Sequence, residues 1–262
     1  MAATKKTVLI TGSTRGIGLA LATHYTKAGW NVIGTARVNS NTNDVRSHTS
    51  LSIMYLAYNC LSQQLAALSP LKIVTIDTTD EVSVADAARQ LDGVAIDLLI
   101  NNAGTGWLTK IVEPTKEMFV KVYEVNVVGP FLVTRALQPN LKLAAKLHGS
   151  SSVVQISSLL GSLSSNTAEN SSTFNGQYSY SASKAALNMV TRSLAMNLRD
   201  NNIAVVALNP GYVDTELTGN LGVLKPADVA SSIADIANKL SIEDTGKFLN
   251  ADPTFPGTEM PW

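Results

Sequence analysis

Short apolar segments alternate with longer helical segments along most of the chain, and this alternation limits the fold more than any other feature. Several short segments are continuously apolar, such as VLI at 8–10, DLLI at 97–100 and IAVVAL at 203–208. Uninterrupted apolar runs are typical of strands buried on both faces. Because strands alternating with helices form right-handed crossovers, the sequence predicts an α/β fold: a Rossmann-like, doubly wound parallel sheet with helices on both faces.

The strands and helices can be assigned from this pattern. Strands are expected at 7–10, 31–35, 71–76, 97–100, 152–156, 203–208 and 246–249. Helices are expected at 16–27, within 51–68, at 81–91, over 115–147 with bends at Gly129-Pro130 and Pro139, at 180–198 and at 226–240. Since neither a break in composition nor an internal repeat divides the chain, residues 1–262 are expected to form a single domain.

Charge balance and cysteine content exclude several classes of protein. The chain has 20 Lys and Arg against 20 Asp and Glu, so it lacks the cationic field that binds nucleic acid or anionic membranes. A single cysteine, Cys60, excludes an internal disulfide, and three scattered histidines predict no metal site. With no signal-like leader and no apolar span of about 20 residues, the protein is expected to be soluble and cytoplasmic.

A glycine-rich turn, TGSTRGIG at 11–18, joins the first expected strand to the first helix. Gly12 permits a tight turn, Gly16 lets the backbone approach a pyrophosphate, and Gly18 allows close packing of helix and strand. The free N–H groups at the start of the helix would face the phosphates. The turn therefore indicates a dinucleotide site, although three glycines after a strand also suit a tight turn without a ligand.

Two arginines flank this expected site. An NAD site usually has Asp or Glu about 20 residues past the glycines. Here Ala36 and Arg37 occupy that region, and Arg15 lies inside the glycine turn. Two cations without a carboxylate favour a 2′-phosphate and hence NADP(H). The alternative is two solvated surface arginines.

A tyrosine and a lysine, Tyr180 and Lys184, stand four residues apart and thus on one face of an expected helix. A free tyrosine has a pKa of about 10. A nearby ammonium stabilises phenolate and is expected to lower that pKa, making Tyr180 a plausible proton donor to a carbonyl oxygen. Taken alone, such a pair is also common on protein surfaces.

Six motifs follow one another in a characteristic order. They are 11–18, NNAG at 101–104, Asn126, Ser158, Tyr180 with Lys184, and NPG at 209–211. This ordered set resembles the single-domain short-chain dehydrogenases/reductases over essentially the whole chain. TGSTRGIG, YSASKAALNM and EMPW are most similar to the carbonyl-reductase branch that includes the C-factor-like and sniffer-like proteins.

The resemblance implies a catalytic tetrad and NADPH-dependent reduction of a ketone or aldehyde to an alcohol. Tyr180 would be the general acid, and Lys184 would lower its pKa and bond the nicotinamide ribose. Ser158 would hydrogen-bond the substrate carbonyl, with Ser157 as its rival, and Asn126 would hold a relay water. Two alternatives stay open: an alcohol dehydrogenase running in the oxidative direction, and a cofactor-binding regulatory protein on the same fold.

The resemblance also implies the cofactor-binding residues. They are Gly12, Ser13, Thr14, Arg15, Gly16, Ile17, Gly18, Arg37, Asp77, Thr78, Asn102, Ala103, Gly104, Tyr180, Lys184, Pro210, Gly211, Val213 and Thr215. Val213 would press on the nicotinamide ring. The family often pairs through its two long central helices, so a homodimer or homotetramer is expected.

The expected substrate is a small carbonyl or alcohol with apolar character. Pocket candidates are mostly apolar: Trp107, Leu159, Leu160, Tyr212 and Leu217. The polar segment 162–177 connects Ser158 to Tyr180 and offers little to bury, so it is expected to stay solvated unless something anchors it. It is predicted to be a flap whose Phe174 touches ligand, and the alternative is a passive insertion.

Overall fold

The computed structural model describes residues 5–37, 63–254 and 257–262. The strands are β1 (Thr7–Ile10), β2 (Asn31–Ala36), β3 (Lys72–Thr75), β4 (Leu98–Asn101), β5 (Ser151–Ile156), β6 (Ile203–Asn209) and β7 (Phe248–Asn250). The α-helices are α1 (Gly16–Lys27), α3 (Glu81–Gln90), α4 (Lys116–Tyr123), α5 (Gly129–Ala136), α6 (Gln138–His148), α7 (Ser171–Phe174), α8 (Tyr178–Leu198) and α9 (Pro226–Ala237).

These strands form one sheet in the order β3-β2-β1-β4-β5-β6-β7, and every neighbouring pair is parallel. From β1 the chain winds outward to β2 and β3, then crosses to β4 and continues the other way. The order reverses between β1 and β4, and in folds of this kind the ligand-binding crevice lies at that point, at the carboxyl ends of the strands. The expected doubly wound parallel sheet is confirmed.

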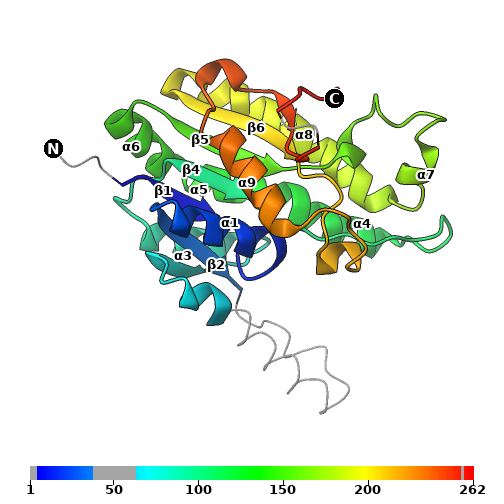
Figure 1. Cartoon of the computed structure of the whole chain (residues 1–262), viewed down its shortest axis with the longest axis horizontal. Helices are drawn as coiled ribbons and strands as arrows, with labels where there is room; N and C mark the ends of the chain where they lie inside the picture. Colours follow the sequence, from blue (N-terminus) through cyan, green and yellow to red (C-terminus); the bar gives the residue numbers. More distant parts are fainter. Residues whose placement is uncertain (1–4, 38–62, 255–256) are drawn as a thin grey trace, which may run out of the picture.

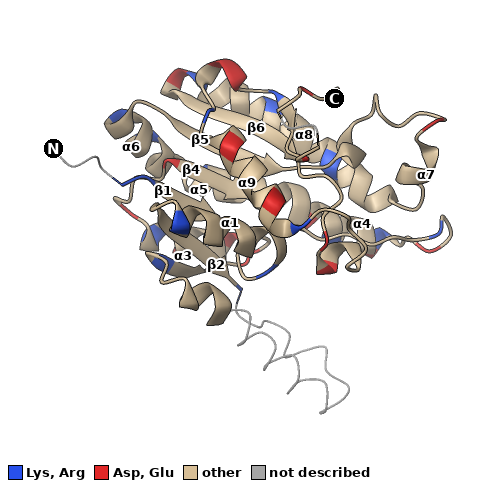
Figure 2. Cartoon of the chain, viewed as in Figure 1, with Lys and Arg blue, Asp and Glu red and all other residues tan. Residues whose placement is uncertain are grey.

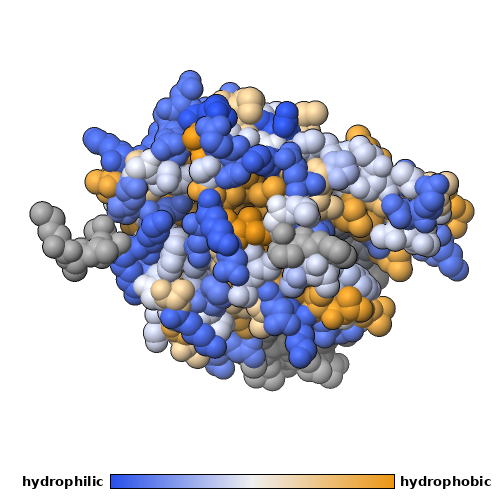
Figure 3. All heavy atoms as spheres, turned by 45° about the horizontal axis from the view of Figure 1, so that its top comes forward, coloured by the Kyte–Doolittle hydropathy of each residue, from blue (hydrophilic) through white to orange (hydrophobic). Residues whose placement is uncertain are grey.

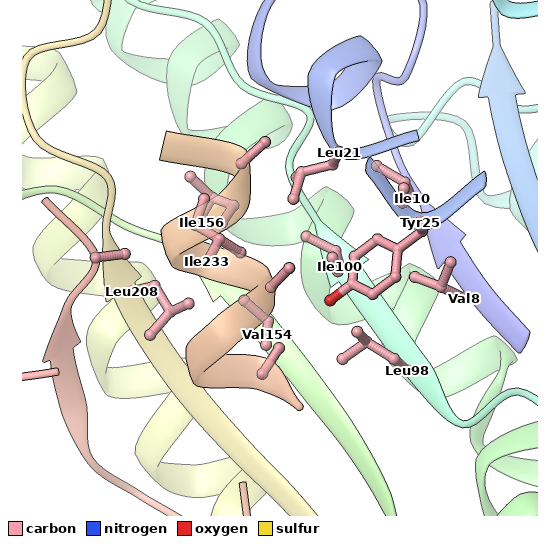
Figure 4. Close-up of a cluster of buried hydrophobic side chains, with 14 of the residues drawn as sticks. Val8, Ile10, Leu21, Tyr25, Leu98, Ile100, Val154, Ile156, Leu208 and Ile233 are labelled. Carbon is pink, nitrogen blue, oxygen red and sulfur yellow. The ribbon is translucent and has the colours of Figure 1, made fainter. Parts of the chain in front are cut away.

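Two apolar cores lie on opposite faces of the sheet. Side chains alternate between them, because successive residues of a strand point to opposite faces. Val8 and Ile10 face α1 and α9 with Leu21, Tyr25 and Ile233, as Figure 4 shows. On the other face, Leu9 packs with apolar residues of α3, α5, α6 and α8 (Figure 1). Burial on both faces explains why the strand sequences are continuously apolar.

The helical region predicted over 115–147 is less regular than expected. A five-residue π-helix, η1 (Glu124–Val128), separates α4 from α5, and Leu137 separates α5 from α6. Helix α8 begins two residues before its predicted start, at Tyr178, and α9 ends at Ala237 rather than 240. Residues 63–67 are helical, whereas the rest of the predicted helix within 51–68, with Cys60, lies outside the described residues.

Acidic and basic side chains are interspersed in the view of Figure 2, in keeping with the zero net charge. Among the residues that the structure describes, no helix combines the length and apolarity needed to cross a bilayer. Within the same residues, no group of three or more His, Cys, Asp or Glu side chains is arranged to hold a metal ion.

Candidate active site

The predicted site residues gather at the carboxyl edge of the sheet, because parallel strands all end there. The glycine turn follows β1, Arg37 follows β2, Asp77 follows β3, Asn102 follows β4, Ser158 follows β5 and Pro210 follows β6. Segments far apart in sequence therefore surround one crevice at the switch point between β1 and β4.

The glycine turn has the conformation that a phosphate cradle requires. Gly12 has φ +65°, and a Cβ there would lie 3.0 Å from the Cα of Ala103. A Cβ on Gly18 would lie 2.2 Å from the carbonyl oxygen of Gly12. Asn102 completes the turn by donating from Nδ2 to the carbonyl oxygens of Thr11 and Gly12 at 3.0 and 3.2 Å. Only glycine fits at 12 and 18, so backbone N–H groups can approach a ligand closely.

The two arginines differ in their surroundings. Arg37 is exposed and makes no ion pair with any described residue. Arg15 forms an ion pair with Glu216, which lies in the 3₁₀-helix η4 (Glu216–Thr218) of the loop after β6. A Cβ on Gly16 would lie 3.3 Å from Thr215 Cγ2, so this loop also contacts the glycine turn. Arg15 therefore already has a carboxylate partner.

Ser158, Tyr180 and Lys184 come together where β5 ends and α8 begins. Lys184 Nζ lies 5.5 Å from the centroid of the Tyr180 ring and donates to the carbonyl oxygen of Ile156 at 2.7 Å. Lys184 is only 4% exposed. A hydrogen bond between the side chains of Ser158 and Tyr180 lowers the pKa of the phenol. The serine hydroxyl, the phenol and the ammonium thus share one site.

Burial dominates the titration of this pair, and the expected lowering of the tyrosine pKa is wrong for this structure. Desolvation raises the pKa of Tyr180 to about 12, and the Ser158 hydrogen bond opposes this only in part. Desolvation also lowers the pKa of Lys184 to about 8. Both shifts have the same cause, since a buried site disfavours the phenolate and the ammonium alike.

Asn126 is fully buried in the π-helix η1 and makes three hydrogen bonds. Its Nδ2 donates to the carbonyl oxygen of Thr105 at 2.8 Å and to Ser183 Oγ at 2.9 Å, and its Oδ1 accepts from Thr105 N at 2.9 Å. A Cβ on Gly104 would lie 3.4 Å from that Oδ1 and 3.8 Å from Lys184 Nζ. Asn126 therefore ties the loop after β4 to α8, beside the lysine.

Ser157 and Ser158, the two candidates for the substrate-facing serine, have different surroundings in the structure. Ser157 is 1% exposed, and its hydroxyl donates to Asn188 Oδ1 at 2.6 Å. Ser158 is half-buried, next to Tyr180, and its Oγ accepts from Leu160 N at 3.2 Å. Only the hydroxyl of Ser158 faces the tyrosine, so the geometry favours Ser158 as the substrate-facing serine.

Several predicted cofactor residues use their side chains within the protein. Ser13 is fully buried and bonds Thr35 of β2 through its hydroxyl. The carboxylate of Asp77 accepts from Thr79 N and Oγ1, while Thr78 packs against Gly129. These side chains shape the crevice wall. The remaining predicted positions lie at the same edge of the sheet: Thr14, Ala103, Pro210, Gly211 and Val213 on connecting segments, with Val213 only 2% exposed, and Ile17 in the first turn of α1.

Gly106 has a contact that the motifs did not indicate. A Cβ at this position would lie 2.5 Å from Cδ2 of the Tyr180 ring. The loop after β4 therefore rests directly on the ring of Tyr180. Seventy-four positions separate the two residues, so no local pattern in the sequence could have revealed the contact.

Gly106→Ala should lower kcat by about 10- to 100-fold, because the new methyl group would displace the Tyr180 ring and small misplacements of reacting groups are costly. Affinity for NADPH should change by less than about twofold. Steady-state kinetics with a fluorescence titration of NADPH would measure both. Thr109→Ala, in the same loop, is the control and should keep kcat; full activity of Gly106→Ala would contradict the contact.

The segment 162–177 is mostly exposed, as its composition predicts, and a few of its residues anchor it. Phe174 is 8% exposed and belongs to the short helix α7, so it does not project from a solvated loop. The carbonyl oxygen of Gly176 accepts from Thr109 N at 3.0 Å. At its other end, Ser162 Oγ donates to the carbonyl oxygen of Pro261 at 2.8 Å. The segment forms part of the molecule's outer end in Figure 1.

Exposed apolar side chains surround this end of the molecule. Trp107 is 37%, Tyr212 50% and Leu217 49% exposed, while Leu159 and Leu160 are half-buried. In Figure 3, hydrophobic side chains lie among hydrophilic ones at the end that carries α7. The apolar pocket candidates thus lie on the segments that follow β4, β5 and β6, at the carboxyl edge of the sheet.

Comparisons with known proteins show which family this chain is similar to. Residues 6–223 match the family described as short chain dehydrogenase. The chain is 33% identical to the C-signal of Myxococcus xanthus over 168 residues, which cover 64% of this chain and 93% of that protein. It is 30% identical to the short chain dehydrogenase gsfK of Penicillium aethiopicum over 98% of this chain and 99% of that one.

Solved structures agree with the sequence matches. NADPH-bound carbonyl reductase from chicken fatty liver is 31% identical, with a TM-score of 0.78 over 98% of this chain and 99% of that one. Carbonyl reductase Sniffer of D. melanogaster is 27% identical, with a TM-score of 0.78 over 98% of this chain and 100% of that one. The resemblance noted in the sequence is confirmed.

Proposed function

The chain belongs to the short-chain dehydrogenase family, and from that premise we propose that it is an NADPH-dependent carbonyl reductase with Tyr180 as its general acid. The observation that carries the proposal is the shared site of Ser158, Tyr180 and Lys184 beside the glycine cradle. NADPH supplies the hydride when bound, and the protein's task is to place the carbonyl and stabilise its developing charge.

The side chains of the site have separate roles in the proposed reaction. Ser158 and Tyr180 donate hydrogen bonds to the carbonyl oxygen, as donors in an oxyanion hole do. Tyr180 then gives its proton to the alkoxide, and the ammonium of Lys184 stabilises the resulting phenolate. Asn126 holds the loop at Thr105 and helix α8 in place, next to the lysine.

The reductive direction is proposed because the phenol of Tyr180 carries a proton that a carbonyl oxygen can receive. With a pKa of about 12, the phenol keeps its proton near neutral pH and is ready to act as an acid. Oxidation would need the phenolate, which burial disfavours. An NADPH-oxidation screen over ketones, aldehydes and quinones tests the proposal. Tight NADPH binding without turnover on any of them would instead favour the cofactor-binding regulatory protein.

The cofactor is NADP(H), because the exposed Arg37 lies where an NAD site has a carboxylate and makes no ion pair with a described residue, whereas Arg15 is paired with Glu216. Arg37→Asp should raise the Kd for NADPH about tenfold or more and lower the Kd for NADH, since a carboxylate repels a 2′-phosphate and accepts from a 2′-OH. Arg37→Gln is the matched control: it should lose NADPH affinity without gaining NADH affinity. Fluorescence titration measures both, and a wild-type preference for NADH would overturn the assignment.

The proposed substrate is a small molecule with an apolar body. Trp107, Tyr212 and Leu217 lie exposed on loops around the site, where they could cover such a molecule. The same screen should therefore show lower KM values for aromatic or long-chain carbonyls than for short polar ones.

The protein is also proposed to self-associate through α4, α5 and α8. Phe119, Tyr123 and Phe131 of the first two helices are 38–47% exposed, and Met189 and Met196 of α8 are 68% and 58% exposed. Exposed apolar patches of this kind mark interfaces. Light scattering should give at least twice the mass of one chain, and Tyr123→Glu with Phe131→Glu should shift it toward the monomer. A wild-type monomer would contradict the proposal.

A further inference from the structure

We propose that the segment 258–262, and Trp262 above all, is a positioning element for Ser158. It holds the turn that carries this serine against the catalytic helix α8. The inference rests on the proposed function, since it concerns the hydrogen bond from Ser158 to the substrate carbonyl. The segment includes EMPW at 259–262, which carried part of the family resemblance, but none of the site residues that the resemblance implied.

The segment runs antiparallel beside β7. Met260 N donates to the carbonyl oxygen of Phe248 at 2.7 Å, and Asn250 N donates to that of Thr258 at 2.8 Å. A bridge pairs Leu249 with Glu259. The backbone of the segment is thus fixed to the edge of the sheet.

Trp262 is held from two sides. Its ring stacks on Phe248, with centroids 5.3 Å apart and planes inclined by 27°. The guanidinium of Arg192, from α8, lies 5.6 Å from the tryptophan ring. Since Phe248 is fully buried, the indole rests on the core of the protein.

This anchored segment accepts three hydrogen bonds from the chain just after the catalytic turn. Ser162 Oγ donates to the carbonyl oxygen of Pro261 at 2.8 Å. Ser164 donates to the carbonyl oxygen of Trp262 from its backbone N at 3.1 Å and from Oγ at 2.7 Å. Ser162 is 1% exposed, so its hydroxyl is shielded from water that could replace the bond.

Ser162 is the residue that ends the turn of Ser158. The 3₁₀-helix η2 (Leu159–Gly161) has Ser158 as its N-cap and Ser162 as its C-cap. On the side of α8, a Cβ on Gly161 would lie 2.8 Å from the backbone carbon of Lys184. The turn is therefore held between the catalytic helix on one side and Pro261-Trp262 on the other, and a shift at Ser162 would be passed to Ser158.

Removing the indole of Trp262 should therefore lower kcat by displacing Ser158. Trp262→Ala should lower kcat about 5- to 20-fold with the Kd for NADPH unchanged, and Trp262→Phe, which keeps a ring on Phe248, should recover most of the loss. In a Ser158→Ala background, Trp262→Ala should lower kcat by less than about twofold, because the group that it positions is already absent. Equal fold losses in both backgrounds would overturn the inference.

A second measurement does not depend on turnover. Hydrogen exchange at the amides of Gly161 and Ser162, which bond the carbonyl oxygens of Ser158 and Leu159, should speed up about tenfold or more in Trp262→Ala. Trp30→Ala, which removes an indole on the opposite face of the sheet, should leave exchange at these amides unchanged. Unchanged exchange in Trp262→Ala would refute the inference. If exchange speeds up in Trp262→Ala but the wild-type protein reduces no carbonyl, only the proposed function is refuted.

Discussion

Tyr180→Phe should lower kcat for carbonyl reduction by about 10²-fold or more while leaving the Kd for NADPH within about twofold of wild type. The substitution removes the proposed proton donor and one of the two hydroxyls that are proposed to bond the carbonyl oxygen. It keeps the ring, which rests against Gly106 and lies 5.5 Å from the ammonium of Lys184. Steady-state kinetics and a fluorescence titration of NADPH measure the two quantities separately.

Tyr178→Phe is the matched control for this substitution. Tyr178 stands two residues earlier on the same helix and is 36% exposed, and Ala182 rather than a lysine follows it four residues later. Its hydroxyl has no cationic neighbour at that spacing, so kcat should stay close to wild type. If Tyr180→Phe turned over as fast as this control, Tyr180 could not be the general acid.

The fold was predictable because the strands are apolar on both faces. Segments such as VLI at 8–10 and IAVVAL at 203–208 alternate their side chains between two cores, and no surface strand would tolerate them. Their parallel arrangement then placed Ser158 and the glycine turn at one edge of the sheet. The pattern of apolar residues and the right-handed connections between parallel strands were together sufficient to predict this part of the fold.

What could not be predicted depends on contacts between distant segments. The π-helix around Asn126 replaces a regular helix, and Asn126 there bonds Thr105 and Ser183. The anchoring of 162–177 depends on Pro261 and Trp262, about a hundred positions away. Neither composition nor periodicity carries information about such pairings.

The pKa of Tyr180 is a second property that the sequence could not predict. A spacing of four residues correctly placed Lys184 beside the tyrosine, and proximity to a cation alone would lower the phenol pKa. Burial, which depends on the packing of the whole site, outweighs that effect and raises it to about 12. Spacing predicts which groups meet, whereas their titration depends on how much water remains around them.

Lys184→Met should lower kcat by about 10²-fold or more and, at the same time, stabilise the folded protein at neutral pH. The loss of activity follows because no cation then stabilises the phenolate that forms when Tyr180 gives up its proton. The gain in stability follows because wild type buries an ammonium that is 4% exposed. Methionine fills similar space without a charge, although the bond to the carbonyl oxygen of Ile156 is lost.

The sign of the stability effect can be worked out from the pKa of Lys184. Burial lowers it from the ordinary value of 10.5 to about 8, so below pH 8 the folded protein bears the full cost of the buried charge. Between about pH 8 and 10.5 the unfolded chain binds a proton that the folded protein has released, and wild-type stability rises with pH. Lys184→Met lacks this rise. Urea unfolding should find the variant more stable by roughly 1–3 kcal/mol at pH 7, with a smaller difference at pH 10. A difference in stability that stays constant between these pH values would show that Lys184 keeps its ordinary pKa in the folded protein and that burying its ammonium does not cost stability.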